Sequence, residues 1–292
     1  MISTVGQLLL ENNEPLLKMW SVGVEPGARP FVRHSHFRFE ITAVTGGSGE
    51  YTTENAVYPM KPGDIFIAAS NEVHCITNAG ENGLFITNLH FEPRYLAQKG
   101  SIESNSALTR LCFFHSPEFK NRIPADKAGI IRQNHNCIKK EFEKNDGLLP
   151  TAVEAHLNLI LIDLIRNQNY DANPAYDAKE HTVNMLRIYD YIEQHICEEL
   201  KLERLAEIMA LTPNYFSHLF KKLNGITVCD YINAKRIEKA TRILTSGSNK
   251  LTMLEIATTC GFNNTAHFNK MFKKYRGFTP SQLKADPKLL WH

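Results

Sequence analysis

The sequence predicts a multidomain α+β protein: a β-rich N-terminal domain of the barrel or sandwich type, then helices, then an all-α C-terminal domain with two helix-turn-helix motifs. Short β-type runs separated by Gly, Pro and Asn fill residues 5–92. The hydrophobic period becomes helical after about residue 102, and near the C-terminus one basic helical pattern occurs twice. A chain of 292 residues is long enough for two domains with separate cores.

The β-type segments of the N-terminal part are short and end at turn residues. Three of them read FEITAVT, DIFIAAS and LFITNLHF, and the stretches between such runs read VEPGA, TGGSG, KPGD and NAGENG. Many short strands joined by tight turns are typical of a barrel or a sandwich. Residues 5–92 are therefore predicted to form one β-domain.

Two amphipathic helices are predicted behind this β-domain, over residues 128–144 and 151–168. The first has an apolar stripe of Ile131, Cys137, Ile138 and Phe142. The second is apolar over most of its circumference, with Val153, Leu157, Leu159, Ile160, Leu161, Ile162, Leu164 and Ile165. We expect such a helix to pack both on its own domain and on a second copy of the chain; the alternative is burial within one chain.

Residues 169–181 are polar, contain Pro174 and lack an apolar stripe, so we interpret them as an interdomain linker. The predicted boundaries follow from these features. They are a β-domain over 1–100, a helical dimerisation region over 101–170, a linker over 171–182 and a repeat domain over 183–286.

The C-terminal pattern is a duplicated unit. Leu205-Ala206 matches Ile256-Ala257 at an offset of 51 residues, and a longer run matches at an offset of 52. That run pairs Phe216, Phe220, Lys221, Lys222, Gly225 and Thr227 with Phe268, Phe272, Lys273, Lys274, Gly277 and Thr279. The one-residue difference falls in a turn, which absorbs an insertion. Each copy therefore predicts a short helix, a turn and a longer helix.

Capping residues support these helices. Thr212 suits the N-cap of the first longer helix, and Pro213 suits its first position. In the second copy, Gly261 suits the left-handed residue after the short helix, and Asn263 suits the N-cap of the longer one. The residues expected to be buried at helical spacing are Phe216, Leu219, Phe220 and Leu223, then Phe268, Met271, Phe272 and Tyr275.

Polar and cationic side chains occupy the opposite face of each longer helix. They are Asn214, Ser217, His218 and Lys221 in the first copy, and Thr265, Asn269, Lys270 and Lys273 in the second. Such side chains bind base edges and phosphates in a major groove, although one helix with this face is usually only solvated. The tandem copy favours double-stranded DNA as the partner. The connecting helix expected over 231–246, ~24 Å long, would set the two faces about one DNA turn apart.

The charge distribution agrees with a polyanionic partner. Residues 181–285 contain 15 Lys/Arg and 9 Asp/Glu, whereas residues 1–180 contain 17 and 21. The six cysteines form no C-x-x-C pair, and the chain shows neither a signal-peptide pattern nor a membrane-length apolar run. We therefore expect a cytoplasmic protein with reduced thiols and no membrane partner.

Many of these positions belong to one known pattern over about residues 184–285. They are Leu205-Ala206, the run from Tyr215 to Lys221, Gly225, Tyr231, Arg236, Ala240, Leu244, Ile256-Ala257, Gly261-Phe262, Phe268, Phe272-Lys273, Gly277 and Pro280. With them the segment closely resembles the AraC/XylS family of bacterial transcription regulators. The resemblance implies that both longer helices enter successive major grooves, with six residues toward the bases: Asn214, Ser217, His218, Thr265, Asn269 and Lys270.

One departure from that family concerns base selection. The family often has Arg at the positions of His218 and Lys270. Neither replacement offers the rigid two-pronged fork that reads guanine, so strong selection of guanine is not expected there.

A row of polar residues marks the β-domain. Even spacing puts four of them on one face of a predicted strand: His34, His36, Arg38 and Glu40. A Pro-Gly-Asp turn, a strand and His74 follow. With Gly47, these segments resemble the two cupin motifs, H-x-H-x3-E-x6-G and P-G-D with a later His. Cupins are small β-barrels that AraC-type regulators often carry in front, so the resemblance implies an N-terminal cupin-like barrel.

Three uses of this barrel remain open. In metal-dependent cupin enzymes these positions bind a divalent cation, which would make His34, His36, Glu40 and His74 ligands. A sensor barrel would instead hold a polar small molecule without metal, between the same residues, Arg38 and the aromatic side chains of Trp20, Tyr51 and Phe66. The third use is purely structural.

The leading interpretation is a transcription regulator, an activator or a repressor, and not an enzyme. It would be a homodimer that binds DNA, works on RNA polymerase, needs no cofactor and responds to a small-molecule effector, with a sugar suggested by family habit. The alternative is a metal-dependent cupin enzyme with an appended DNA-binding domain.

Overall fold

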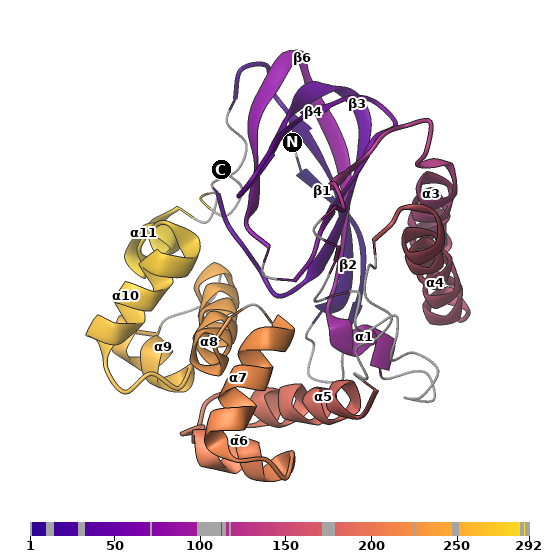
Figure 1. Cartoon of the computed structure of the whole chain (residues 1–292). Coiled ribbons are helices and arrows are strands. Elements are labelled where there is room, and N and C mark those ends of the chain that lie inside the picture. The colour runs from indigo at the N-terminus through magenta and orange to yellow at the C-terminus, as the bar shows by residue number, and fades with distance from the viewer. Residues whose placement is uncertain are drawn as a thin grey trace. The chain divides into compact units, whose positions relative to one another are not determined.

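The computed structural model describes residues 2–9, 15–28, 33–70, 72–97, 112, 115–116, 118–170, 179–224, 226–246, 251–286 and 289. The chain divides into two compact domains, Met1–Thr182 and Val183–His292 (Figure 1). Within the described residues, every helix is too short or too polar to cross a bilayer.

Among its described residues, the N-terminal domain contains one antiparallel sheet of seven strands. In chain order these are β1 (Ile2–Leu9), β2 (Pro15–Val24), β3 (Phe39–Thr53), β4 (Val57–Met60), β5 (Ile65–Ala68), β6 (His74–Phe91) and β7 (Arg122–Ile123). Their spatial order is β1-β2-β6-β3-β5-β7, with β4 paired to β3. The long strands β3 and β6 therefore lie at the centre, and the predicted fold class is confirmed.

The two faces of this sheet have separate cores, because successive residues of a strand point to opposite sides. One face gathers Val22, Val44, Tyr51, Leu84 and Ile86 into an inner cluster. The other face carries residues such as Met19, Ile41, Leu89 and Phe91, which pack with the helices behind the sheet.

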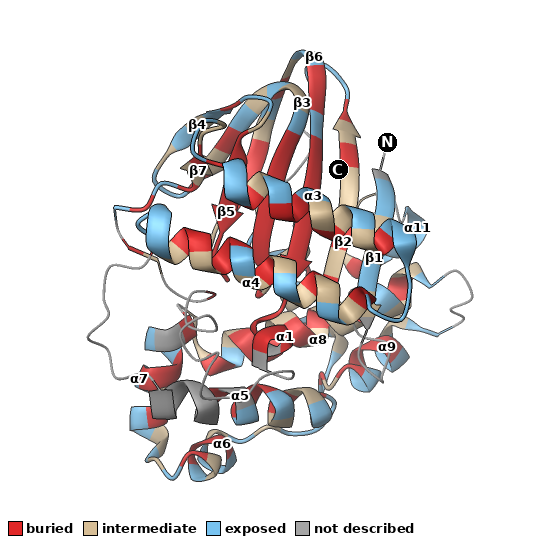
Figure 2. Cartoon of the chain, turned by 90° about the vertical axis from the view of Figure 1, so that its right-hand side faces the viewer, coloured by how far each residue is buried: buried red, intermediate tan, exposed pale blue. Residues whose placement is uncertain are grey.

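The covering helices are α3 (Gly129–Lys144) and α4 (Leu149–Asn167), preceded by the short α1 (Pro93–Ala97). Figure 2 shows α3 and α4 lying across the sheet. Their buried residues, such as Ile138 and Leu157, belong to the same core cluster as the sheet residues. Most apolar residues of α4 are buried within this domain, but the side chain of Leu159 is 49% exposed. One face of α4 is therefore buried within its own domain. Its predicted contact with a second copy of the chain stays a prediction.

The region 101–170, predicted to be helical, also contains the strand β7, which pairs with β5. A two-residue strand is too short to produce a periodic pattern in the sequence. Residues 171–178, most of the predicted linker, lie outside the described residues.

The C-terminal domain is all-helical. Its helices are α5 (Lys179–Gln194), α6 (Leu202–Ile208), α7 (Pro213–Asn224), α8 (Val228–Thr245), α9 (Met253–Thr259), α10 (Thr265–Arg276) and α11 (Pro280–Ala285). The starts of α6 and α9 are 51 residues apart, and those of α7 and α10 are 52 apart. The predicted duplication is thus confirmed, with a turn one residue longer in the second copy.

Three of the four residues predicted at helix ends have the predicted position. The Tyr215 amide donates to Thr212 Oγ1 at 3.4 Å, Pro213 is the first residue of α7, and Gly261 has φ +82°. The cap predicted at Asn263 is wrong. α10 begins only at Thr265, so the extra turn residue moves the cap to Asn264, whose Oδ1 accepts from the His267 amide at 2.8 Å.

Helix α8 carries the core of both helix-turn-helix motifs. Toward its N-terminal end, the Tyr231 ring lies 5.6 Å from that of Phe220 on α7. Farther along, Ile237, Ala240 and Leu244 pack in one cluster with residues of α9, α10 and α11. Gly225 and the side chain of Leu223, both part of the predicted repeat, lie outside the described residues.

Candidate functional site

The outward face of α7 carries the first group of predicted DNA-binding residues. Phe216, Leu219 and Phe220 are buried on the opposite face. As a result, Asn214, His218 and Lys221 are exposed and Ser217 is half-buried. The spacing of the apolar residues alone sets this orientation.

Helix α10 repeats the arrangement. Phe268 and Phe272 are fully buried, and Met271 and Tyr275 are half-buried against the same core. On the other face, Asn269, Lys270 and Lys273 are exposed and Thr265 is half-buried. All eight predicted positions therefore lie away from the core, and their contact with DNA remains a prediction.

The neighbouring lysine on α10 has a different role. Lys274 Nζ donates to Asp230 Oδ1 at 2.7 Å, and this hydrogen bond lowers the pKa of the Asp230 carboxyl. The hydroxyl of Tyr275 donates to the Asp230 carbonyl oxygen at 3.0 Å. These bonds attach α10 to α8.

In the N-terminal domain, a buried carboxylate collects imidazoles. Glu40 on β3 is 5% exposed. Its Oε2 lies 3.0 Å from His36 Nε2, 3.2 Å from His74 Nε2 and 2.5 Å from His90 Nε2. Its Oε1 accepts from the Thr42 hydroxyl at 2.7 Å.

Strand register brings these groups together. Glu40 on β3 stands opposite His90 on β6, and Thr42 stands opposite Asn88. An isolated bridge pairs His34 with His74, which places the segment before β3 beside the start of β6. His36 and His90, 54 positions apart in the sequence, thus converge on one carboxylate.

The hydrogen bonds on the far side of two rings define their tautomers. His36 Nδ1 lies 2.9 Å from the Arg38 carbonyl oxygen, and His74 Nδ1 lies 2.9 Å from that of Glu72. A carbonyl only accepts, so each Nδ1 must carry the proton. In a neutral ring, Nε2 then carries a lone pair that faces the Glu40 carboxylate. A proton or another cation must lie between Nε2 and the carboxylate oxygen, because the two repel each other otherwise.

Burial shapes the protonation of this cluster. Burial, helped by the charge of His90, lowers the pKa of His36 to about 4. Burial also lowers the pKa of His90. Burial opposes a charged Glu40, but His90 and His74 bring the pKa of this carboxyl well below its ordinary value. Burial is also the largest single effect on His74 and lowers its pKa, but the charge and hydrogen bond of Glu40 and the contacts with Glu72 together outweigh it, so the pKa of His74 is raised.

The donor set fits a divalent transition metal. The donor atoms of His34, His36 and His74 lie within 4.8 Å of one another, as do those of His36, Glu40 and His90. Imidazole and carboxylate are ligands of iron, manganese and zinc. The Nδ1–H to carbonyl bonds of His36 and His74 are the outer contacts that orient histidine ligands toward a metal.

Aromatic rings surround the same cluster. The Trp20 ring stands edge-on to His90 at 4.4 Å, and the Tyr51 ring stacks on His74 at 5.8 Å. Phe66 packs on Tyr51 at 4.6 Å, one layer farther from Glu40. Arg38 contacts Glu92 at 3.5 Å.

Two buried polar atoms near this cluster lack a partner among the described residues: Tyr51 Oη and Asn88 Oδ1. A buried polar atom without a hydrogen bond costs free energy, so both positions call for a group that supplies one.

The sequence prediction for this site was partly wrong. Of the four residues assigned to one strand, only Glu40 lies in β3; His34, His36 and Arg38 precede it outside the strand. The geometry nevertheless brings His34, His36, Glu40 and His74 together. Sequence reasoning missed His90 and Asn88, although the alternation in LFITNLHF puts both on the inner face with Leu84 and Ile86.

Comparison with known protein families gives two matches. Residues 26–137 match the AraC-like ligand binding domain, and residues 205–286 match a helix-turn-helix domain. The first match covers the histidine cluster, and the second covers α7 and α10.

Relatives match over most of the chain. The HTH-type transcriptional activator RhaS of Pectobacterium carotovorum is 24% identical over 268 residues, which span 90% of this chain and 92% of RhaS. The probable transcriptional regulator LumQ of Photobacterium leiognathi is 29% identical over 267 residues, spanning 91% and 97%.

Among solved structures, ToxT from Vibrio cholerae has the same fold. One ToxT structure superimposes with a TM-score of 0.59 at 12% identity, covering 92% of this chain and 98% of ToxT. A second, bound to a naphthalenyl butenoic acid, gives a TM-score of 0.61 at 11% identity, covering 94% and 99%.

Proposed function

This chain belongs to the AraC family of transcription regulators, with a ligand-binding and a DNA-binding domain, and we propose that an effector in the first controls how the second binds a promoter. The observation that carries this proposal is the pair of exposed polar faces on α7 and α10, placed at equivalent positions of a duplicated motif. In this proposal residues 1–100 bind the effector, 101–170 dimerise, 171–182 link the domains and 183–286 bind DNA.

We propose that α7 and α10 contact adjacent major grooves of one duplex. The exposed side chains of Lys221, Lys270 and Lys273 would neutralise phosphates and release counterions. Affinity for a selected duplex should then fall steeply between low and moderate salt, which fluorescence anisotropy measures. A flat salt response would contradict the proposal.

We propose that the effector is a polar molecule rich in hydroxyl groups, such as a sugar. Its support is local: Trp20 and Tyr51 offer aromatic surfaces beside Glu40, and the unpartnered Tyr51 Oη and Asn88 Oδ1 require hydrogen bonds. A thermal-shift screen of sugars and related metabolites tests this idea, because a bound ligand stabilises the folded state.

Two variants make the screen specific. Tyr51→Phe should remove the shift that a positive compound causes, because the hydroxyl that would bind it is gone. Tyr58→Phe is the matched control, since Tyr58 is half-buried beside the same inner cluster. Equal shifts in wild type and Tyr51→Phe would exclude this binding mode.

A second candidate for the barrel is a divalent metal ion, favoured by the converging Nε2 lone pairs of His36 and His74. His36, Glu40 and His90, with His74 or His34, would hold it, and a bound metal would act as a Lewis acid. Elemental analysis of purified protein measures the content. Metal near one equivalent that is lost in His36→Ala but kept in His156→Ala would support it, and it would also revive the cupin-enzyme alternative.

We propose that the chain activates transcription, as the name of its RhaS relatives states for them, by acting on RNA polymerase at the promoter. A reporter gene behind the selected operator tests the direction. Lower expression with the protein than without it would make the chain a repressor instead.

A further inference from the structure

We propose that Arg236 on α8 is a positioning residue that holds the second helix-turn-helix against the first and so sets the spacing between the α7 and α10 faces. The inference rests on the proposed function, because it concerns how both faces bind one duplex.

The guanidinium of Arg236 binds the segment that leads into the first motif. Nε donates to the Ile196 carbonyl oxygen at 2.9 Å, and Nη2 donates to that of Glu198 at 2.7 Å. Both carbonyls lie between α5 and α6, outside regular structure. A planar fork that donates to two carbonyls holds that backbone in one place, which a single ammonium cannot do.

The turn of the second motif rests on the same pair of groups. Gly261 sits between α9 and α10, and a Cβ built on it would lie 2.7 Å from the Ile196 carbonyl oxygen and 2.8 Å from Arg236 Nε. The ring of Phe262 lies 5.9 Å from Arg236 Cζ. One side chain therefore contacts the entry to the first motif and the turn of the second.

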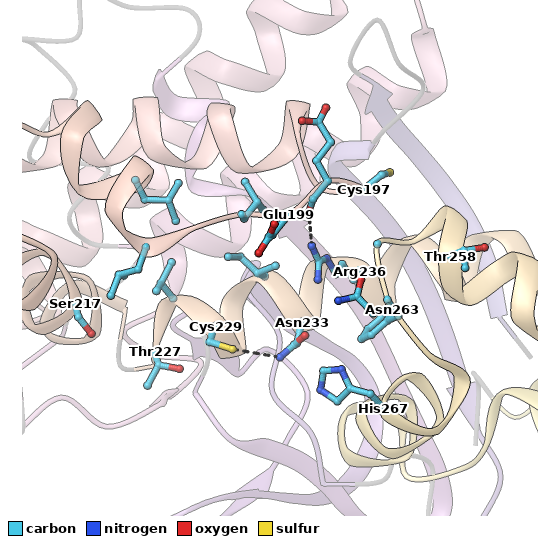
Figure 3. A pocket seen from close by; sticks show the side chains of 18 residues that line it. Cys197, Glu199, Ser217, Thr227, Cys229, Asn233, Arg236, Thr258, Asn263 and His267 are labelled. Carbon is cyan, nitrogen blue, oxygen red and sulfur yellow. Dashed lines mark hydrogen bonds between the residues drawn. The ribbon is translucent and has the colours of Figure 1, made fainter.

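A cleft separates the two motifs beside Arg236. About 720 Å³ of open space lies beside α8, lined from one side by Leu202, Leu205 and Ser217 and from the other by Thr258, Asn263 and His267. Figure 3 shows Arg236 between the two sides, with its bond to the preceding loop. Open space separates the two motifs beside α8, so packed side chains do not hold them together at this place. The contact of Arg236 with both motifs restrains their separation instead.

Fixed spacing matters for binding two grooves together. Once one motif is bound, the other binds with an effective concentration that is high only if the geometry matches. If the contacts of Arg236 were lost, the two motifs could move relative to each other. The affinity for a site with both halves would then fall, and the affinity for one half would stay unchanged. It would also weaken the preference for one spacing between the halves.

The test uses the full chain and a duplex obtained by in vitro selection with the wild-type protein. Binding is measured by anisotropy at one salt concentration for three kinds of duplex. The first is intact, the second has one or the other half scrambled, and the third has one, two or three base pairs inserted between the halves. The variants are Arg236→Lys, which keeps the charge without the fork, and Arg236→Ala. Arg242→Ala on the exposed side of α8 is the control, and thermal melts report folding.

We expect Arg236→Ala to weaken binding to the intact duplex at least about tenfold, with half-site binding within about twofold of wild type. Arg236→Lys should fall between wild type and Arg236→Ala, and both should tolerate the inserted base pairs better than wild type. Equal losses on intact and half sites, or an unchanged spacing preference in a folded Arg236→Lys protein, would overturn the proposal. If wild type selects no specific duplex, the proposed function itself fails, which is a different result.

Discussion

Replacing Gly261 with Ala tests the packing of the two helix-turn-helix motifs. Gly261 has φ +82°, and a methyl group there meets the Ile196 carbonyl oxygen at 2.7 Å and Arg236 Nε at 2.8 Å. The left-handed conformation costs an L-residue about 1–2 kcal/mol. The carbonyl is backbone and must retreat by about 0.7 Å to reach ordinary contact, and overpacking of this kind costs about 1–3 kcal/mol.

The two costs together are about 2–5 kcal/mol, a large part of the stability of a small domain. For a domain of this size, they should lower the midpoint of thermal unfolding by at least about 8 °C. Differential scanning calorimetry of the full chain measures it, with the loss expected in the transition of the C-terminal domain.

Gly27→Ala is the control that separates the two costs. Gly27 has φ +71°, but a Cβ there meets nothing within 4 Å, so only the conformational cost applies. If Gly261→Ala is no more destabilising than Gly27→Ala, the close approach of Gly261 to Ile196 and Arg236 does not constrain the packing of the two motifs.

Three further predictions concern other parts of the chain. Lys270→Ala should cost about 1–3 kcal/mol in DNA binding and change the base preference, whereas Lys273→Ala should weaken all sequences alike if it binds a phosphate; selection with each variant distinguishes these outcomes. Burial lowers the pKa of His135 from 6.5 to about 4. Between these pH values the unfolded chain binds a proton that the folded chain does not, so the free energy of unfolding should fall by up to about 3 kcal/mol as the pH falls from 6.5 to 4. Urea melts of His135→Asn should show a flatter pH dependence of this free energy. Leu159→Glu on the exposed side of α4 should convert a dimer to monomers in sedimentation experiments, while Leu148→Glu, at a residue 70% exposed, should not.

The C-terminal domain could be predicted well because its signals are local. The apolar spacing of Phe216 and Phe220 decides which face of α7 is buried, and the same spacing recurs in α10. Capping depends on the backbone near one residue, so Thr212 and Gly261 were predicted correctly. The error at Asn263 came from the extra turn residue: the 52-residue offset that pairs Phe216 with Phe268 pairs Thr212 with Asn264.

The histidine cluster shows where such reasoning stops. His36 and Glu40 are close in sequence and could be paired from their spacing. His90 is 50 residues from Glu40, and only the register of β6 against β3 brings its ring to the carboxylate. Register depends on the whole strand pair and on both faces of the sheet, so no short segment contains it.

The sequence by itself determined the helical repeat, the faces of its two longer helices and the β-class of the N-terminal domain, because hydrophobic period and capping act over a few residues. The tertiary structure decided which imidazoles surround Glu40, and it decided that Arg236 joins the Ile196 carbonyl to the Gly261 turn. The contact of His90 with Glu40 joins residues 50 positions apart, and that of the Gly261 turn with Ile196 joins residues 65 apart, so their geometry follows from packing that only the folded chain has.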